Sequence, residues 1–240
     1  MSDVINDVML GTLPARALLF DLDGTLVDTA PDLANATNAL RAQHGLAPLP
    51  FATIRRQVSN GGSALVTLAL GFDVDHPHHG AARTFLLNAY EQAIATHSRV
   101  FSPLDTWLNR WQRNSGLWGI VTNKPRRYTE PLLKALALEP GALLCADDLS
   151  VKKPSPEPLW EAARRLNIAP HECWYVGDHL RDMQAAKAAG MTAVAVGYGY
   201  ISEEDDYRQW PADVWFSDCA ALVAALPSME SSLRQSDSPR

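Results

Sequence analysis

Residues 17–25 read Ala-Leu-Leu-Phe-Asp-Leu-Asp-Gly-Thr, so four apolar residues lead directly into two aspartates and a glycine. An apolar run without polar alternation is typical of a strand that is covered on both faces, as in a parallel sheet. The glycine relaxes the backbone limits for the turn that must follow. This stretch therefore predicts a buried strand that ends at a pair of carboxylates.

Asp21 and Asp23 are expected to face the same space, because residues two apart point to the same side of an extended chain. Two carboxylates this close repel each other, and both stay ionised only beside a cation or strong hydrogen-bond donors. Mg²⁺ prefers oxygen ligands and would meet that need. The alternative interpretation is an ordinary turn, since Asp-Gly after a strand is also a common turn signal.

Further apolar runs of strand length follow, and helical patterns lie between them. These runs are Leu117–Val121, Ala142–Cys145, Cys173–Val176, Thr192–Val196 and Asp213–Phe216. The alternation of strand and helix from 101 to 226, together with the first strand, predicts a doubly wound, Rossmann-like α/β core with a parallel sheet.

Residues 30–98 break this rhythm, because they carry helical patterns and no convincing strand. We expect a small all-α cap domain here, inserted into a core made of residues 1–29 and 99–227, with a flexible tail at 228–240. The insertion follows the first strand, at the end of the sheet where open α/β sheets bind ligands. A lid over an active site is the resulting hypothesis.

Polar residues at the ends of later strands strengthen the hypothesis of a catalytic site. Thr122 follows the second run, Lys153 precedes a proline and a helix, and Asp178 follows the fourth run with Asp182 four residues later. Each has an ordinary structural alternative, such as a threonine cap, a surface lysine or a capping aspartate. Their occurrence together at successive strand ends favours a catalytic arrangement.

In these pieces the chain resembles the haloacid dehalogenase superfamily. The resemblance rests on Phe-Asp-Leu-Asp-Gly-Thr-Leu at 20–26, Val-Thr-Asn-Lys-Pro at 121–125, Lys-Pro at 153–154 and Val-Gly-Asp-His-Leu-Arg-Asp at 176–182. It implies that Asp21 is a nucleophile that attacks phosphorus, while Asp23 protonates the leaving alcohol and later activates water. It also implies that Thr122 and Lys153 hold the phosphoryl oxygens.

By the same resemblance, Mg²⁺ is the expected cofactor. Asp21, Asp178 and the backbone carbonyl of Asp23 would bind it, with Asp182 as a supporting carboxylate. Position 179 departs from the usual pattern, because His stands where relatives carry Asp, Ser or a similar small polar residue. This His179 would either weaken Mg²⁺ binding, favour softer divalent ions, or have no role.

The presence of Asp23 favours phosphoryl transfer over dehalogenation, so a phosphomonoester hydrolase is expected. A sugar-phosphate mutase and a non-catalytic phosphate-binding module on the same fold remain alternatives. Within the superfamily the chain is similar to the phosphoglycolate phosphatase-like subgroup, and in it to phosphatases of N-acetylmuramic acid 6-phosphate in peptidoglycan recycling. This finer resemblance rests on segments 97–99, 117–125, 129–131 and 198–201.

Both of those substrates carry a carboxylate as well as a phosphate, and arginine pairs well with carboxylates. Arg99 is expected to take that role, and the loop Asn60-Gly61-Gly62 is expected to close on the substrate. Asn123 and Lys124 are further expected substrate contacts. The loop that holds His76, His78 and His79 is either a second metal site or a solvated surface.

Composition sets the remaining expectations. The net charge is −6 and basic residues are not clustered, which argues against nucleic acid or an anionic membrane as partner. Residues 1–14 contain no Lys or Arg, and no apolar stretch reaches about 18 residues, so a cytoplasmic location is expected. The three cysteines lack metal-like spacing and are expected to be buried thiols. The expected partner is a small phosphorylated metabolite, and the chain would be a monomer or small homo-oligomer.

Overall fold

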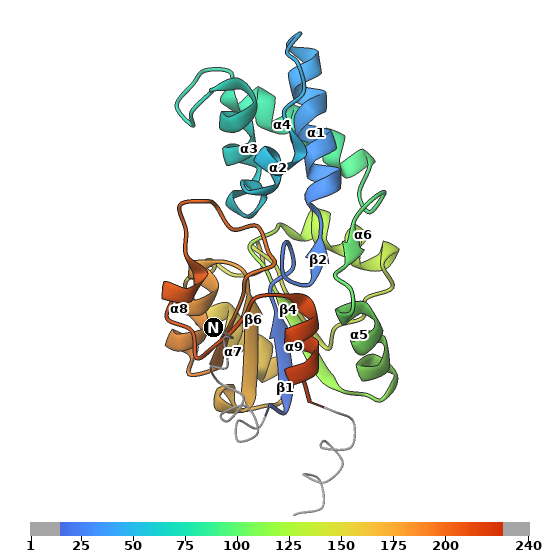
Figure 1. The fold of residues 1–240 in the computed structure, drawn as a ribbon, viewed down its shortest axis with the longest axis vertical. Helices are drawn as coiled ribbons and strands as arrows, with labels where there is room; N and C mark the ends of the chain where they lie inside the picture. The colour runs from blue at the N-terminus through green and yellow to red at the C-terminus, as the bar shows by residue number, and fades with distance from the viewer. Residues whose placement is uncertain (1–14, 228–240) are drawn as a thin grey trace, which may run out of the picture.

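The computed structural model describes residues 15–227. An α/β core forms the larger part of the molecule, and a group of helices stands on one end of it (Figure 1). The expectations for the leader at 1–14 and for the tail at 228–240 concern residues outside this range.

A parallel sheet of six strands forms the centre of the core. Its strands are β1 (Ala17–Phe20), β4 (Leu117–Val121), β5 (Ala142–Leu144), β6 (Cys173–Gly177), β7 (Thr192–Val196) and β8 (Val214–Phe216). They lie in the order β5-β4-β1-β6-β7-β8, and every neighbouring pair is parallel. The chain builds outward from β1 to β5 and then returns to place β6 on the other side of β1. This confirms the doubly wound fold and puts its topological switch point between β1 and β6.

Helices cover both faces of the sheet. The first face carries α5 (Leu104–Arg113), α6 (Arg126–Ala135) and α9 (Cys219–Ala225), and the second carries α7 (Glu157–Arg165) and α8 (Leu180–Ala189). Successive strand residues alternate between the two cores, so Leu18 and Phe20 pack on the first face and Leu19 on the second. Short 3₁₀ turns precede β6 at Pro170–Glu172 and β8 at Tyr207–Gln209.

The inserted segment is the expected all-helical cap. It consists of α1 (Ala30–Gln43), α2 (Phe51–Arg55), a 3₁₀ turn (Val58–Asn60), α3 (Gly61–Leu70) and α4 (His79–Gln92). These helices share a hydrophobic cluster of their own, to which the core adds Tyr128 and Tyr200. Figure 1 shows the cap standing over the end of the sheet at which β1 and β6 finish.

Two very short strands mark where the chain enters and leaves the cap. β2 (Val27–Asp28) pairs antiparallel with β3 (Arg99–Val100). Next to them the buried carboxylate of Asp32 accepts hydrogen bonds from the N–H groups of His97 and Ser98, each at 2.9 Å, and from the Ser98 hydroxyl at 2.6 Å. The start of α1 is therefore tied to the segment that returns to the core.

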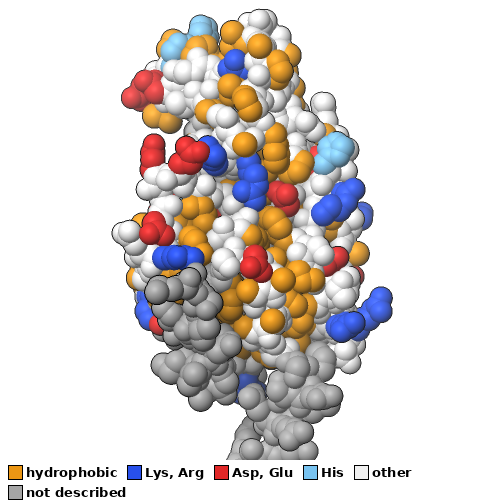
Figure 2. All heavy atoms as spheres, in the orientation of Figure 1, with side chains coloured by type: hydrophobic (Ala, Val, Ile, Leu, Met, Phe, Trp, Pro, Cys, Tyr) orange, Lys and Arg blue, Asp and Glu red, His pale blue; other side chains and the backbone are white. Residues whose placement is uncertain are grey.

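Several features of the described residues bear on partners. All three cysteines are buried and unpaired, as expected. Between residues 15 and 227, no helix has the length and apolar character needed to cross a membrane. On the face drawn in Figure 2, acidic and basic side chains are interspersed, and the described residues form no large block of one sign.

Candidate active site

The two aspartates that end β1 and β6 lie side by side at the switch point of the sheet. The N–H of Asp21 donates to the carbonyl of Val176 at 2.9 Å, which continues the parallel pairing one residue beyond β1. Asp178 follows β6 directly and is buried. Its Oδ1 accepts from the Thr25 hydroxyl at 2.9 Å and its Oδ2 from the N–H of Tyr200 at 2.8 Å. These bonds hold the carboxylate in a fixed orientation.

A third carboxylate, Asp182, comes from the first turn of α8 and completes a cluster. One oxygen of each of Asp21, Asp178 and Asp182 lies within 4.8 Å of the others, and among the described residues this is the only group of three or more potential metal ligands so close together. Burial raises the pKa of Asp21, and burial together with the charges of Asp21 and Asp182 raises the pKa of Asp178 to about 7. A hard divalent cation fits this oxygen set and would relieve the repulsion.

Lys153 is the cation that the protein itself places in this cluster. Its Nζ lies 2.8 Å from Asp21 Oδ1 and 2.8 Å from Asp182 Oδ1, and it donates to the Tyr175 hydroxyl at 2.7 Å. Burial alone would lower the pKa of Lys153, but Asp182 and Asp21 more than offset this and raise it. The lysine therefore stays charged and fixes the direction of the Asp21 carboxylate.

The backbone around Asp178 is packed too closely to allow side chains. A Cβ at Gly24 would lie 2.3 Å from Asp178 Oδ2, and one at Gly199 would lie 2.2 Å from Asp178 Cβ. Gly24 also has a φ of +86°, which favours glycine. The turn after β1 thus supports the acidic cluster by direct contact with it.

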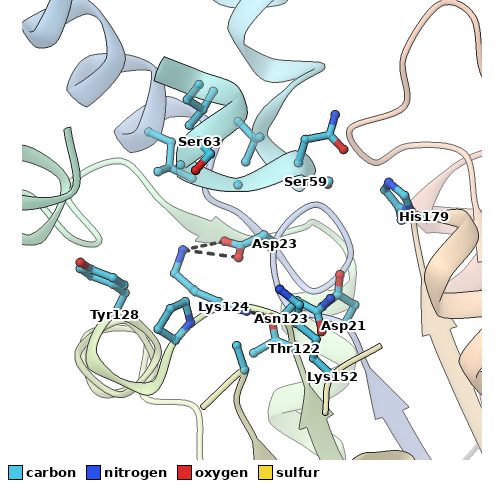
Figure 3. Close-up of a pocket in the computed structure, with 18 of the residues that line it drawn as sticks. Asp21, Asp23, Ser59, Ser63, Thr122, Asn123, Lys124, Tyr128, Lys152 and His179 are labelled. Carbon is cyan, nitrogen blue, oxygen red and sulfur yellow. Dashed lines mark hydrogen bonds and ion pairs between the residues drawn. The ribbon is translucent and has the colours of Figure 1, made fainter. Parts of the chain in front are cut away.

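The Asp23 carboxylate belongs to a different group of contacts. Its Oδ1 accepts from the Thr29 hydroxyl at 2.5 Å and from Lys124 Nζ at 3.0 Å. Figure 3 shows Asp23 between Lys124 and the cap segment that carries Ser59, with Asp21 on its other side. Burial alone would lower the pKa of Lys124, but Asp23 raises it overall. The sequence led us to expect that Asp23 would bind a metal through its backbone carbonyl. Its side chain is not a member of the three-carboxylate cluster.

Thr122 and Asn123 lie at the end of β4, next to these carboxylates (Figure 3). The Thr122 hydroxyl accepts from the N–H of Lys124 at 3.1 Å. The Asn123 side-chain amide pairs with the backbone of Lys153, donating at 2.9 Å and accepting at 3.1 Å. Asn123 therefore joins the loop after β4 to the loop that carries Lys153.

A cavity of about 650 Å³ separates the strand ends from the cap. The sequence-predicted residues that line it are Asp21, Asp23, Asn60, Gly61, Gly62, Thr122, Asn123, Lys124 and Lys153. Arg99 does not line it, so the structure does not place this residue with the other expected substrate contacts. Arg99 belongs to β3 at the cap junction, where its guanidinium donates to the carbonyls of Ala95, Thr96 and Ser98.

Comparison with known proteins gives the family of this chain. Residues 15–190 match a family model described as haloacid dehalogenase-like hydrolase. The chain belongs to this family. Of its relatives, an N-acetylmuramic acid 6-phosphate phosphatase of Pseudomonas aeruginosa is 41% identical over 88% of this chain and 94% of that protein. A phosphoglycolate phosphatase of Xanthomonas campestris is 39% identical over 83% of this chain and 90% of that protein.

Among solved structures, a predicted phosphoglycolate phosphatase from Haemophilus somnus superposes on this haloacid dehalogenase-like hydrolase with a TM-score of 0.76. The two are 25% identical, and the alignment covers 88% of this chain and 97% of the other. The cap and the core are therefore both part of the shared fold.

In this haloacid dehalogenase-like hydrolase His179 has a structural role at the start of α8. Its Nδ1 accepts from the N–H of Arg181 at 3.2 Å and from Arg181 Nε at 3.1 Å. Burial and the charge of Arg181 lower the pKa of His179 to about 4, so the imidazole is neutral near pH 7. His179 lines the cavity but is not a member of the three-carboxylate cluster.

Several functional contacts of this hydrolase were not predicted from the sequence. The Tyr175 hydroxyl accepts from Lys153, and the Tyr200 hydroxyl donates to Asp28. Nothing in the sequence distinguishes these two tyrosines from ones that only pack. Ser59 of the cap donates to Asp178 Oδ2 at 3.4 Å, a contact that depends on how the cap sits on the core. The histidine loop of the cap stays outside this site, where the rings of Phe72 and His76 stack at 3.8 Å.

Proposed function

We propose that this chain is a Mg²⁺-dependent phosphatase that cleaves phosphate monoesters through an aspartyl-phosphate on Asp21. The observation that carries the proposal is the placement of the Asp21 carboxylate. One of its oxygens is bound by Lys153, and its side chain remains 13% exposed toward a cavity lined by Thr122 and Asp23. The names of the relatives at 41% and 39% identity support the same reaction class.

In the first step an Asp21 oxygen attacks phosphorus, forming a carboxyl O–P bond as the ester O–P bond breaks. Lys153 and Thr122 bind the phosphoryl oxygens, and Lys153 also keeps the nucleophile in line. Mg²⁺ held by Asp21, Asp178 and Asp182 would supply positive charge against the phosphoryl oxygens, so that two anions can approach each other. Thr25 and Tyr200 orient Asp178 for that purpose.

Asp23 serves the leaving group and then the water. It gives a proton to the departing alcohol and becomes a carboxylate, which Thr29 and Lys124 stabilise through the contacts at 2.5 and 3.0 Å. In the second step this carboxylate takes a proton from the water that attacks the aspartyl-phosphate. Phosphate is released and Asp21 is regenerated.

The substrate is a small phosphorylated acid. The relatives are named for phosphoglycolate and for N-acetylmuramic acid 6-phosphate, and both compounds join a phosphate monoester to a carboxylate. A cavity of about 650 Å³ lies within the range of about 300–1,000 Å³ that is usual for small-molecule sites.

Asp21→Asn tests the reaction directly, because it keeps the shape of the side chain and removes the nucleophile. We expect the rate of phosphate release to fall at least about a thousandfold, with thermal unfolding showing a folded protein. Asp148→Asn is the matched control, since Asp148 binds Arg126 outside the cavity. Chelation of divalent ions should stop the wild-type reaction, and added Mg²⁺ should restore it. Near-normal turnover of Asp21→Asn would refute the proposal.

A further inference from the structure

Some of the Lys and Arg side chains that line the cavity are bound to other residues, and some are not. The cationic lining residues are Arg83, Lys124, Lys152, Lys153 and Arg181. Three of them have contacts: the two lysines described above bind aspartates, and Arg181 donates to His179. Within residues 15–227, neither the Arg83 guanidinium nor the Lys152 ammonium forms a hydrogen bond or an ion pair with another described residue. These two cations are free to receive an anionic group of a ligand.

The two free cations lie on opposite sides of the cavity. Lys152 precedes Lys153, and Figure 3 shows it on the core side near Thr122 and Asp21, where the transferred phosphate is expected. Arg83 belongs to α4 of the cap, and its Nε lies 3.7 Å from where a Cβ on Gly62 would be. Arg83 is therefore the free cation of the cap side, next to the glycine loop that faces the core.

One face of α4 is turned toward the cavity. Arg83, Leu87 and Tyr90 all line it, and their spacing of four and three residues places them in one row along the helix. The seven residues from Tyr90 to Arg83 correspond to about 10 Å along the axis. Leu87 fills the middle of the row and would lie 3.3 Å from a Cβ on Gly62.

Tyr90 stands at the end of this row that lies close to Lys124 and Asp23. Its ring lies 4.5 Å from Lys124 Nζ, and Lys124 is bound to Asp23. Tyr90 is 1% exposed, and Lys124 is the described cation beside its hydroxyl. An ammonium can only donate, so the hydroxyl proton has no acceptor among the described residues. Burial raises the pKa of this hydroxyl, so it keeps its proton and is available as a donor. A buried donor without a partner is uncommon in proteins and points to a ligand atom.

From these contacts we infer that the α4 face recognises the part of the substrate beyond the transferred phosphate. Tyr90 donates a hydrogen bond to an oxygen near the leaving group, and Arg83 pairs with a carboxylate about 10 Å farther along the helix. This assignment rests on the proposed phosphatase function and replaces Arg99 as the carboxylate-binding residue.

The row also selects for substrate length. In 2-phosphoglycolate, phosphorus and the carboxyl carbon are only about three bonds apart, less than about 5 Å. In N-acetylmuramic acid 6-phosphate about eight bonds separate them, so its carboxylate can reach Arg83 while the phosphate lies at Asp21. The preferred substrate is therefore a phosphorylated sugar acid with its carboxylate far from the phosphate.

Arg83→Gln tests this with two matched esters. N-acetylmuramic acid 6-phosphate carries the distant carboxylate, and N-acetylglucosamine 6-phosphate is the same sugar without it. We expect kcat/KM for phosphate release from the acid to fall about 10- to 100-fold, mainly through KM, and by at least tenfold more than for the uncarboxylated sugar. Arg99 is exposed and lies outside the cavity, so Arg99→Gln should leave kcat/KM unchanged for both sugars.

Several results would overturn the assignment. Equal losses on both sugars in Arg83→Gln, or a selective loss in Arg99→Gln instead, would remove Arg83 as the carboxylate-binding residue. A higher wild-type kcat/KM on 2-phosphoglycolate than on the sugar acid would contradict the length argument. Each of these outcomes leaves the phosphatase reaction itself intact, whereas absence of phosphate release from every ester would refute the proposed function.

Tyr90→Phe and a binding measurement separate recognition from stability. Because the hydroxyl proton has no acceptor among the described residues, its removal should leave the thermal unfolding temperature nearly unchanged while KM for both sugars rises severalfold. Calorimetry with Asp21→Asn, which binds without turnover, should give a Kd for the sugar acid that rises about 10- to 100-fold when Arg83→Gln is added. An unchanged Kd, or a lower unfolding temperature with unchanged KM, would contradict the inference.

Discussion

The carboxyl group of Asp178 is buried among like charges, and this makes the metal-free protein sensitive to pH. Its pKa is about 7 in the fold against an ordinary value of 3.8, so the folded state holds a proton that the unfolded state has lost. Stability from this group is complete below about pH 4 and is lost as the pH rises through 7. With chelator present, we expect the free energy of unfolding of Asp178→Asn, relative to that of wild type, to rise by about 3 kcal/mol between pH 5 and pH 8. Urea unfolding at both pH values measures this.

A control variant and a Mg²⁺ titration test whether Asp178 is the cause of this pH dependence. Asp148→Asn should show no such trend in this range, because the hydrogen bonds of Asp148 to Arg126 and Cys145 lower its pKa. Saturating Mg²⁺ at pH 8 should stabilise wild type and not Asp178→Asn. Parallel pH curves for wild type and Asp178→Asn would show that the buried cluster is not under electrostatic strain.

The grouping of the residues at the strand ends could be predicted, while that of the residues on the cap side of the cavity could not. Asp21, Asp178 and Thr122 each follow an apolar run, and parallel strands bring their ends together whatever else the chain does. Arg83 and Tyr90 have no such marker, since helical spacing shows that they share a face but not what faces it. Arg99 lies outside the cavity, and this could not be foreseen because position in the sequence near the cap junction does not fix the direction of a long side chain.

The turn between β1 and β2 is an element whose backbone shape the acidic cluster depends on. Gly24→Ala would add a Cβ at 2.3 Å from Asp178 Oδ2 to a residue with a φ of +86°. We expect a loss of about 2–4 kcal/mol in the free energy of unfolding and a higher Mg²⁺ concentration for half-maximal activity. Denaturant titration and a Mg²⁺ activation curve measure the two effects.

Gly45→Ala separates backbone strain from collision. Gly45 also has a positive φ, +69°, but a Cβ there would meet nothing within 4 Å. It should cost only about 1 kcal/mol and leave Mg²⁺ activation unchanged. If both alanine variants behaved alike, close packing against Asp178 would not be the reason for glycine at position 24.

The strands of the sheet were predictable because each is a short apolar run bounded by polar residues. The strands at the cap junction were not, because β2 and β3 have two residues each and no periodicity can be recognised in so short a segment. Next to them the Tyr200 hydroxyl donates to Asp28, and Asp32 accepts from the N–H of Ser98, so distant parts of the chain meet at this junction. Such long-range contacts leave no local pattern in the sequence.

The cap and the core have separate hydrophobic clusters, and several polar contacts join them. Arg55 of α2 provides one of them, since its guanidinium donates to the carbonyls of Gly199 and Tyr198, each at 2.8 Å, and lies 4.8 Å from the Tyr200 ring centroid. These carbonyls belong to the loop whose Tyr200 N–H binds Asp178. The position of the cap is therefore coupled to the acidic cluster through one loop.

Arg55→Met should loosen the cap while leaving the cap and the core folded. It removes two charge-assisted hydrogen bonds, so we expect amide hydrogen exchange in residues 58–70 to become about 10- to 100-fold faster, with little change in the central strands of the core. KM should rise because the cavity closes less often. Arg56→Met is the neighbouring control, since Arg56 only forms an exposed ion pair with Glu203 at 2.6 Å. Equal exchange in the two variants would place the cap–core coupling elsewhere, in the hydrophobic contacts of Tyr128 and Tyr200 with the cap.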